Sequence, residues 1–298
     1  MIVIGDLHLK YKEPYWKAQK KFLNWLKSKF DNEEWVFLGD IYDTVYPHWE
    51  VYETFHNLVN DRKEKTYLLM GNHDFSKFKG NSLKPHFKKE VVEIIEKIAK
   101  YEINSYKCLF LSYNFSDYSS NSNLFTEDYD FVFSHLTHPK EAFGNEGVDL
   151  EFINSKYYIY GHIHTFKIYN NHIILGSPLP TRNLEIPQNI LQINENFKLE
   201  YIKVPSFLKI ENLKYGEEPP NKDWLYNIYD APSFDSVYEN YKDYYIREEG
   251  IKLKESNEII KEDLTFASFS LKDKFLAFAK QENLSDDIIN CFMRYYYD

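Results

Sequence analysis

The chain has 298 residues, of which 43% are hydrophobic and 28% charged, so one large domain or a domain with an appendage is expected. No apolar run approaches the roughly 18 residues that a membrane span needs. The net charge of −10 argues against a broad nucleic-acid-binding surface, but much of it is local, because residues 211–263 hold 14 acids and 7 bases.

The first part of the chain alternates apolar runs with helical patterns. MIVIG (1–5), EWVFLGD (34–40) and TYLLMG (66–71) have the composition of buried strands. Apolar residues recur at helical spacing over residues 14–30, where Pro14 suits a first turn, and again over residues 49–59. This order of strands and helices predicts an α/β core with parallel strands.

The pattern changes from residue 87 onward. We expect a helix over residues 87–101 and then short strands with little helix between them. The strand-like runs are KCLFLSY, DFVFSH, YYIYGH, FKIYNNHIIL, NILQI and KLEYIKV, with Asn170–Asn171 as a hairpin signal. These runs predict a second sheet packed on the first, with helices outside.

Composition also suggests the domain boundaries. From about Pro205 the chain becomes acidic and aromatic, and it includes the run GEEPP (216–220). We therefore divide the chain into a main domain (1–204), a smaller module (205–263) and a C-terminal helical segment (264–298) with a break near Asn283.

The two cysteines and the start of the chain point to a compartment. Cys108 and Cys291 provide neither a disulfide framework nor a zinc spacing. Asp6 and His8 interrupt the first apolar run and no basic segment precedes it, unlike a signal peptide. We expect a reducing cytoplasm and no membrane partner.

Side chains that can bind metal recur where the predicted strands end. They are Asp6, His8, Asp40, Asp43, Asn72, His73, His135, His162 and His164. Each alone could be a helix cap, a turn residue or a core imidazole. The carboxyl ends of parallel strands face one crevice. A single shared site therefore explains these residues better than five separate coincidences, one at the end of each strand.

The residue types favour particular metals. Oxygen ligands combined with imidazoles suit manganese, iron or zinc, whereas calcium would need more oxygens. A carboxylate bridging two cations would hold them at the spacing used to cleave phosphoesters. We expect two divalent ions, with Mn²⁺ favoured over iron, zinc or Mg²⁺. His73, next to Asn72, would contact the phosphate, and Asp74 would orient its imidazole.

The runs GDLH, GDIYD, GNHD, SH and GHIH, in this order, resemble the five motifs of the calcineurin-like metallophosphoesterases. The resemblance covers about the first 180 residues and implies a two-sheet α/β sandwich flanked by helices. It makes His73 the catalytic histidine. It implies a first metal held by Asp6, His8, Asp40 and His164, and a second held by Asp40, Asn72, His135 and His162.

The motifs also indicate a branch of this superfamily. Protein phosphatases of this fold carry Asp-Arg-Gly after the second motif and Glu after GNH, which this chain lacks. GDIYDTVYP and LGSPLPTRNLE are similar instead to the SbcD nucleases and their bacteriophage recombination counterparts. Those proteins continue with a capping domain, here residues 205–263, and with helices that dock on an SbcC-type coiled-coil ATPase, here residues 264–298. The resemblance implies DNA as substrate and that ATPase as partner, and it leaves a homodimer open.

The segment after the third motif bears on the substrate. Residues 75–89 contain five lysines and no acid, which is also common in a solvated loop. We expect Lys77 and Lys79 to contact backbone phosphate. The rival functions are a phosphoesterase for a small molecule, nucleotide or lipid headgroup, and a scaffold that has lost its chemistry.

Overall fold

The structure is a computed structural model of the protein. This structure describes residues 1–76, 80–83, 87–113, 125–142, 147–180, 189–222, 224–247 and 251–254. The chain divides into two compact units, residues 1–253 and 254–298. The predicted C-terminal helical segment lies outside the described residues, so the elements below belong to the first unit.

The first large sheet has six strands in the order β14-β13-β1-β2-β3-β6. Its strands are β1 (Ile2–Ile4), β2 (Trp35–Phe37), β3 (Thr66–Leu69), β6 (Val92–Ile95), β13 (Asn189–Ile193) and β14 (Leu199–Lys203). β1, β2, β3 and β6 are parallel, whereas β13 runs antiparallel to both of its neighbours. The predicted parallel core is therefore confirmed.

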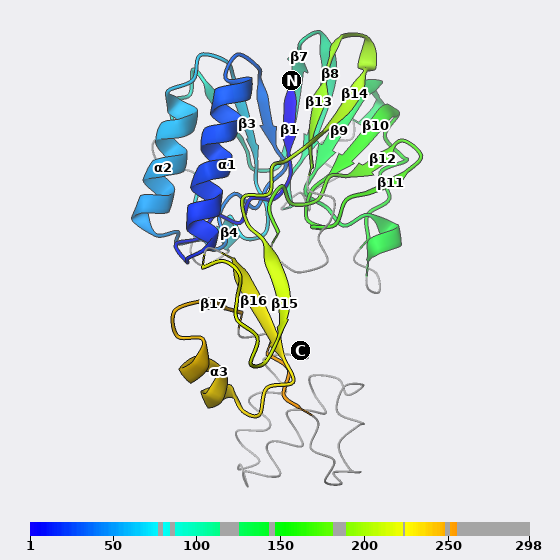
Figure 1. The fold of residues 1–298 in the computed structure, drawn as a ribbon. Helices are drawn as coiled ribbons and strands as arrows, with labels where there is room; N and C mark the ends of the chain where they lie inside the picture. The colour runs from blue at the N-terminus through cyan, green and yellow to red at the C-terminus, as the bar shows by residue number, and fades with distance from the viewer. Residues whose placement is uncertain are drawn as a thin grey trace, which may run out of the picture. The chain divides into compact units, whose positions relative to one another are not determined.

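Two helices connect the first three strands and cover one face of this sheet (Figure 1). They are α1 (Tyr15–Phe30) and α2 (Trp49–Asn60). Phe22 and Leu26 of α1, like Val51 and Phe55 of α2, are four residues apart, on one face of their helix, and are buried against the sheet. This shared apolar layer fixes both helices on the sheet.

The second large sheet has the order β11-β12-β10-β9-β8-β7. Its strands are β7 (Ile98–Ile103), β8 (Tyr106–Leu111), β9 (Tyr129–Ser134), β10 (Ser155–Tyr160), β11 (Lys167–Tyr169) and β12 (His172–Ile174). β8, β9, β10 and β12 are parallel, and β11 and β12 form the predicted hairpin. Asn170 in its turn has a φ of 56°, a left-handed conformation that Asn tolerates well.

The two sheets pack face to face around the central core. Phe110, Phe131 and Phe133 point into it and meet Val3 and Val36 of the first sheet. Their neighbours in sequence, such as Leu109 and Val132, belong to a separate core on the other face of the second sheet. This alternation is the two-residue period of a strand. The predicted class, an α/β two-sheet sandwich, is confirmed.

The predicted helix over residues 87–101 is wrong, because β6 and β7 occupy this stretch. β6 pairs in parallel with β3, with Val92 opposite Thr66, and β7 is antiparallel to β8. Val91, Val92, Ile94 and Ile95 fit a helical spacing, but they are β-branched and pack well on a sheet. Residues 92–95 form a strand because they pair with β3, about 25 residues earlier in the chain. The local sequence around them does not contain this long-range contact.

A smaller three-stranded sheet follows β14 in the chain. Its elements are β15 (Ile210–Lys214), β16 (Leu225–Tyr229), α3 (Phe234–Asn240) and β17 (Tyr245–Ile246). We call residues 205–247 the small module. It has its own core around Tyr226 and Val237, and it contacts α1 where Leu225 packs near Tyr15. The predicted boundary at residue 205 falls between β14 and β15, although the module belongs to the same compact unit as the sandwich.

The remaining elements are short. They are β4 (Phe75–Ser76), β5 (Gly80–Asn81) and the 3₁₀ turns Pro139–Glu141 and Glu195–Phe197. Within the described part of the chain, no helix has the length and apolar character needed to cross a bilayer.

Candidate metal centre

Loops at the carboxyl ends of five parallel strands converge on one region between the two large sheets. The first sheet contributes the loops after β1, β2 and β3, and the second those after β9 and β10. They bring together all seven residues predicted as ligands, namely Asp6, His8, Asp40, Asn72, His135, His162 and His164. The site is thus assembled by topology rather than by nearness in sequence.

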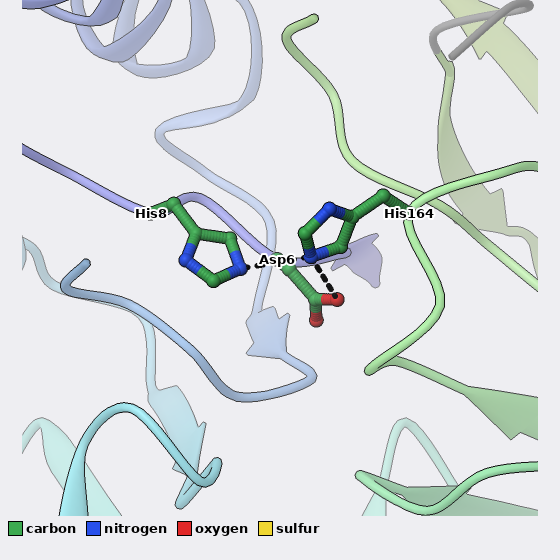
Figure 2. A group of neighbouring side chains, drawn as sticks. All are labelled: Asp6, His8 and His164. Atoms are coloured by element: carbon green, nitrogen blue, oxygen red, sulfur yellow. Dashed lines mark hydrogen bonds and ion pairs between the residues drawn. The ribbon is translucent and has the colours of Figure 1, made fainter. Parts of the chain in front are cut away.

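The first group of ligand atoms comes from Asp6, His8 and His164. One ligand atom of each lies within 4.8 Å of the others. The two imidazole Nε2 atoms are 2.9 Å apart, and Nε2 of His164 is 3.8 Å from Oδ2 of Asp6. Figure 2 shows the three side chains pointing toward one another. Their donor atoms therefore face a common point.

The second group comes from Asp40, His135 and His162, again within 4.8 Å, and Asn72 lies among them. The amide oxygen Oδ1 of Asn72 is 3.1 Å from Nε2 of His135 and 3.0 Å from Nδ1 of His162. This combination of carboxylate, amide oxygen and imidazole suits a divalent transition metal.

Asp40 connects the two groups. Its Oδ2 lies 3.5 Å from Nε2 of His8 and 3.4 Å from Nε2 of His135, one imidazole from each group. Its Oδ1 accepts the backbone N–H of His73 at 2.8 Å, which fixes the carboxylate. Although burial opposes ionisation, the imidazoles of His135 and then His8 hold the pKa of Asp40 well below its usual range. Asp40 is placed to bridge two cations.

Asp6 shows that the donor set fits a metal. Both of its carboxylate oxygens are buried, and in the described part of the chain neither has a hydrogen-bond partner. Burial raises the pKa of Asp6. A buried oxygen without a partner costs on the order of 1–3 kcal/mol, and more when charged. A divalent cation beside His8 and His164 would satisfy these oxygens.

Protonation of the second group should compete with metal binding. Burial alone would lower the pKa of His135, but Asp40 and then Asp6 raise it to about 9. Burial lowers the pKa of His162 to about 4. At neutral pH the metal-free protein therefore carries a proton on His135 that a metal must displace.

We expect metal loading at pH 7 to release at least one proton, because the pKa of His135 lies above that pH. Metal affinity should rise with pH up to about 9, by at most about tenfold per unit for one proton. Isothermal titration of Mn²⁺ in buffers of different ionisation enthalpy measures the release. The same binding enthalpy in every buffer would contradict it.

Outer contacts orient the imidazole ligands. Nδ1 of His135 donates to the carbonyl of Leu38 at 2.7 Å, and Nδ1 of His8 lies 3.3 Å from Oδ1 of Asp43. Each contact turns Nε2 of the ring toward the centre, and such partners of ligands tune metal affinity. Asp43 stood out in the sequence as a strand-end carboxylate, but no role was predicted for it.

Sequence reasoning missed Gln19. This side chain of α1 is buried, and its Nε2 donates to the carbonyl of His8 at 2.8 Å. Its Oε1 accepts the backbone N–H of Lys10 at 3.1 Å. Gln19 thus fixes the loop that carries two ligands. It is one of several polar residues in a helix, and only the fold shows that it points inward.

His73 lies at the edge of the centre. Its ring is 4.7 Å from that of His8, and its Nδ1 donates to the carbonyl of Asp43 at 2.9 Å. His73, His8 and Asp40 also bring ligand atoms within 4.8 Å of one another. Because Nδ1 is engaged with a carbonyl, Nε2 is the nitrogen left to act at the centre.

Asp74 does not hold the imidazole as predicted. Its carboxylate accepts three backbone N–H groups instead, from Gly71 at 3.1 Å, Tyr42 at 3.2 Å and Ile41 at 3.3 Å. Burial, followed by the charge of Asp40, raises the pKa of Asp74 to about 6. Asp74 ties the turn after β3 to the turn after β2, while the carbonyl of Asp43 orients His73.

The glycine before each ligand motif allows close approach. A Cβ on Gly71 would lie 2.1 Å from Oδ1 of Asp40, and one on Gly39 would lie 2.3 Å from Nδ1 of His135. Gly39 also has a φ of 107°, which side chains rarely adopt. The absence of a side chain at these two glycines therefore makes room for Asp40 and His135.

We expect Gly39→Ala to lower metal content sharply, because its methyl group would displace His135. Gly216→Ala is the matched control, since Gly216 has a φ of 93° but a Cβ there meets nothing within 4 Å. Both variants should lose about 1–3 kcal/mol of stability through backbone strain. Metal analysis and thermal melts separate the two effects. Equal metal content in both variants would refute the steric explanation.

Lys77 and Lys79, the predicted phosphate contacts, lie outside the described residues. The same is true of residues 181–188, which include the last five residues of the LGSPLPTRNLE run (175–185). Within its described part, Ser177 donates its hydroxyl to the carbonyl of Asp6 at 2.8 Å. This stretch therefore supports the first ligand loop.

Comparison with known proteins agrees with this geometry. The model of the calcineurin-like phosphoesterase family matches residues 1–166, more than half of the chain. The chain therefore belongs to the calcineurin-like phosphoesterases. This family places it among the metal-dependent phosphoester hydrolases, which use divalent ions. No curated protein is similar enough to match.

Several solved structures are similar at low identity. An archaeal phosphodiesterase is 16% identical, with 68% of this chain and 98% of the other covered and a TM-score of 0.40. A hypothetical protein from Thermus thermophilus is 13% identical, with 68% and 99% covered and a TM-score of 0.41. A protein of unknown function from Aquifex aeolicus is 20% identical, with 52% and 87% covered and a TM-score of 0.31.

Proposed function

We propose that this protein is a two-metal phosphodiesterase that hydrolyses DNA, the nuclease subunit of a complex like that of SbcC and SbcD. The observation that carries the two-metal chemistry is the position of Asp40, whose Oδ2 lies 3.5 Å and 3.4 Å from imidazoles of two separate groups. The likeness of GDIYDTVYP to the SbcD nucleases supports DNA as the substrate.

The chain supplies the following parts of the reaction. The bound metals would neutralise phosphate charge and activate a water. Asp6, His8, Asp40 and His164 would hold one ion, and Asp40, Asn72, His135 and His162 the other. His73 would direct Nε2 at the phosphate and donate a proton to the leaving oxygen, with its ring held by the carbonyl of Asp43.

The substrate assignment is tested with purified protein and Mn²⁺. Single-stranded DNA, double-stranded DNA and a panel of small phosphoesters are compared at equal enzyme concentration, with EDTA as the blank. We expect hydrolysis of DNA at a higher kcat/KM than of any small phosphoester. Hydrolysis of small phosphoesters alone would favour the rival function. Bound metal without any hydrolysis would favour a scaffold.

The proposed ATPase partner is assigned to the C-terminal residues. Apolar residues recur at helical spacing in residues 271–293, as in helices that bind a groove of a partner. We place the protein and this partner in the cytoplasm. A homodimer of this chain is a separate proposal.

Deleting residues 266–298 should leave metal-dependent hydrolysis of a small diester near normal, because the metal centre lies within residues 1–253. It should abolish co-purification with a coiled-coil ATPase. Pull-down with full-length and truncated protein measures this, and the thermal melt is the control. A truncated protein that aggregates would place these residues in the core and contradict the partner role.

A further inference from the structure

A cleft of about 510 Å³ opens beside the metal centre. His8, His73, His164 and Asp43 form one side of it. The opposite side comes from the small module, between Leu225 and Arg247. The volume is within the range of about 300–1,000 Å³ of pockets that enclose a small ligand. A group bound in the cleft would therefore lie against the reacting phosphate.

The charge of the cleft is opposite to that of the chain. Its basic side chains are Lys10, Lys12, Lys242 and Arg247, and its acidic ones are Glu13 and Asp43. Both acids have internal contacts. Glu13 accepts the backbone N–H of Lys17 at 3.2 Å, and Asp43 lies 3.3 Å from His8 and 3.6 Å from Lys10.

The two exposed lysines of the cleft, Lys12 and Lys242, are placed to meet an anion. Arg247 is fixed by a backbone hydrogen bond to the carbonyl of Tyr226 at 2.8 Å. Of the cleft's basic residues, Lys242 and Arg247 come from the small module, which has 8 acids and 5 bases. This acidic module thus contributes two basic residues to a cleft that is also lined by residues of the metal centre.

Aromatic rings line the same wall. Tyr238 of α3 has 46% of its side chain exposed, and Tyr244 and Tyr245 are half-buried. Tyr241 lines the same cleft and is buried, and its hydroxyl accepts the N–H of Gly216 at 2.7 Å. Exposed rings beside basic groups are how proteins hold unpaired nucleic acid, with bases stacked and phosphates paired.

We propose that this cleft binds one unpaired nucleotide of the DNA strand beside the phosphodiester being cut, with its phosphate on Lys12 and Lys242 and its base on Tyr238. This inference rests on the proposed function and specifies its substrate further. Stacking on Tyr238 needs an exposed base face, so the strand must be single at this position. The small module then contributes to substrate recognition.

Binding without cleavage tests the phosphate contacts. The probe is a fluorescein-labelled oligothymidylate, titrated with full-length protein in EDTA at several salt concentrations and followed by anisotropy. In Lys12→Ala/Lys242→Ala the slope of log affinity against log salt should fall by about 0.7 per lost contact. Lys107→Ala/Lys198→Ala is the control, because neither lysine lines the cleft. Equal slopes in both double variants would overturn the proposal.

The stacking contact is tested in the same assay. Tyr238→Ala should weaken oligothymidylate binding about tenfold, whereas Tyr238→Trp should restore it. Tyr229→Ala is the matched control, since Tyr229 is 39% exposed and lies outside the cleft lining. A loss shared by both alanine variants, or by neither, would overturn the role of Tyr238.

An activity comparison separates this inference from the proposed function. The p-nitrophenyl ester of thymidine monophosphate and bis-p-nitrophenyl phosphate share a leaving group and differ in the nucleoside. Tyr238→Ala should lower kcat/KM for the nucleoside ester about tenfold more than it lowers kcat/KM for bis-p-nitrophenyl phosphate. If the cleft binds DNA that the wild type does not cut, the nuclease function fails and the subsite stands. If DNA is cut but no cleft variant affects its binding, the subsite fails alone.

Discussion

Asp40→Asn is expected to remove both metal ions at once. The substitution keeps the size of the side chain but removes the charge, and Oδ2 of Asp40 is the atom that faces imidazoles of both groups. Loss of a residue that hydrogen-bonds to a metal ligand typically lowers metal affinity or activity roughly 10–100-fold. Loss of a bridging ligand itself should therefore lower metal affinity further. Metal content after loading with Mn²⁺ and dialysis, measured by mass spectrometry, gives the result.

Two further variants make this result specific. Asp6→Asn should weaken the first group alone, and His162→Gln the second group alone, because each residue belongs to one group. Wild type should retain two equivalents of metal and each of these variants about one. If Asp40→Asn also retained one full equivalent, Asp40 would be a ligand of a single ion.

His73→Ala is expected to keep both metals and lose most activity. The imidazole lies beside the centre but is not needed to complete either ligand set, and its Nδ1 is held by the carbonyl of Asp43. Loss of general acid catalysis typically costs about 10²–10⁴-fold. The kcat for a small diester and the metal content of the same preparation are measured together.

His56→Ala is a suitable control for this experiment, because His56 lies on α2 and contacts Phe87 rather than the metal centre. It should keep both activity and metal. Loss of one metal equivalent in His73→Ala would mean that His73 is itself a ligand, as its closeness to His8 and Asp40 permits.

The ligand residues could be predicted because each follows a strand that is recognisable by itself. Asp6 comes two residues after Ile4, and His135 directly after Ser134, and parallel strands place such positions at one edge. Local sequence thus contained both the chemistry and its location. The glycines of the motifs could be recognised in the same way, although their steric reason needed atomic positions.

Features that depend on distant contacts could not be predicted. The stretch 87–101 looks helical until β3 and β8 are present to pair with it. The role of Gln19 depends on which side of α1 faces the loop of His8. Likewise, nothing near Lys242 or Tyr238 indicates that the metal centre lies across a cleft from them.

The division of the ligands between two sheets has a thermodynamic consequence. Asp6, His8, Asp40 and Asn72 follow strands of the first sheet, and His135, His162 and His164 follow strands of the second. Bound ions would thus cross-link the halves of the sandwich. The free energy of metal binding would then also favour correct packing of the two sheets. The phenylalanines between the sheets are coupled to the metals in return, since a change in the core that alters the sheet spacing changes every distance across the centre. Core packing far from the substrate would therefore influence how tightly the metal ions bind.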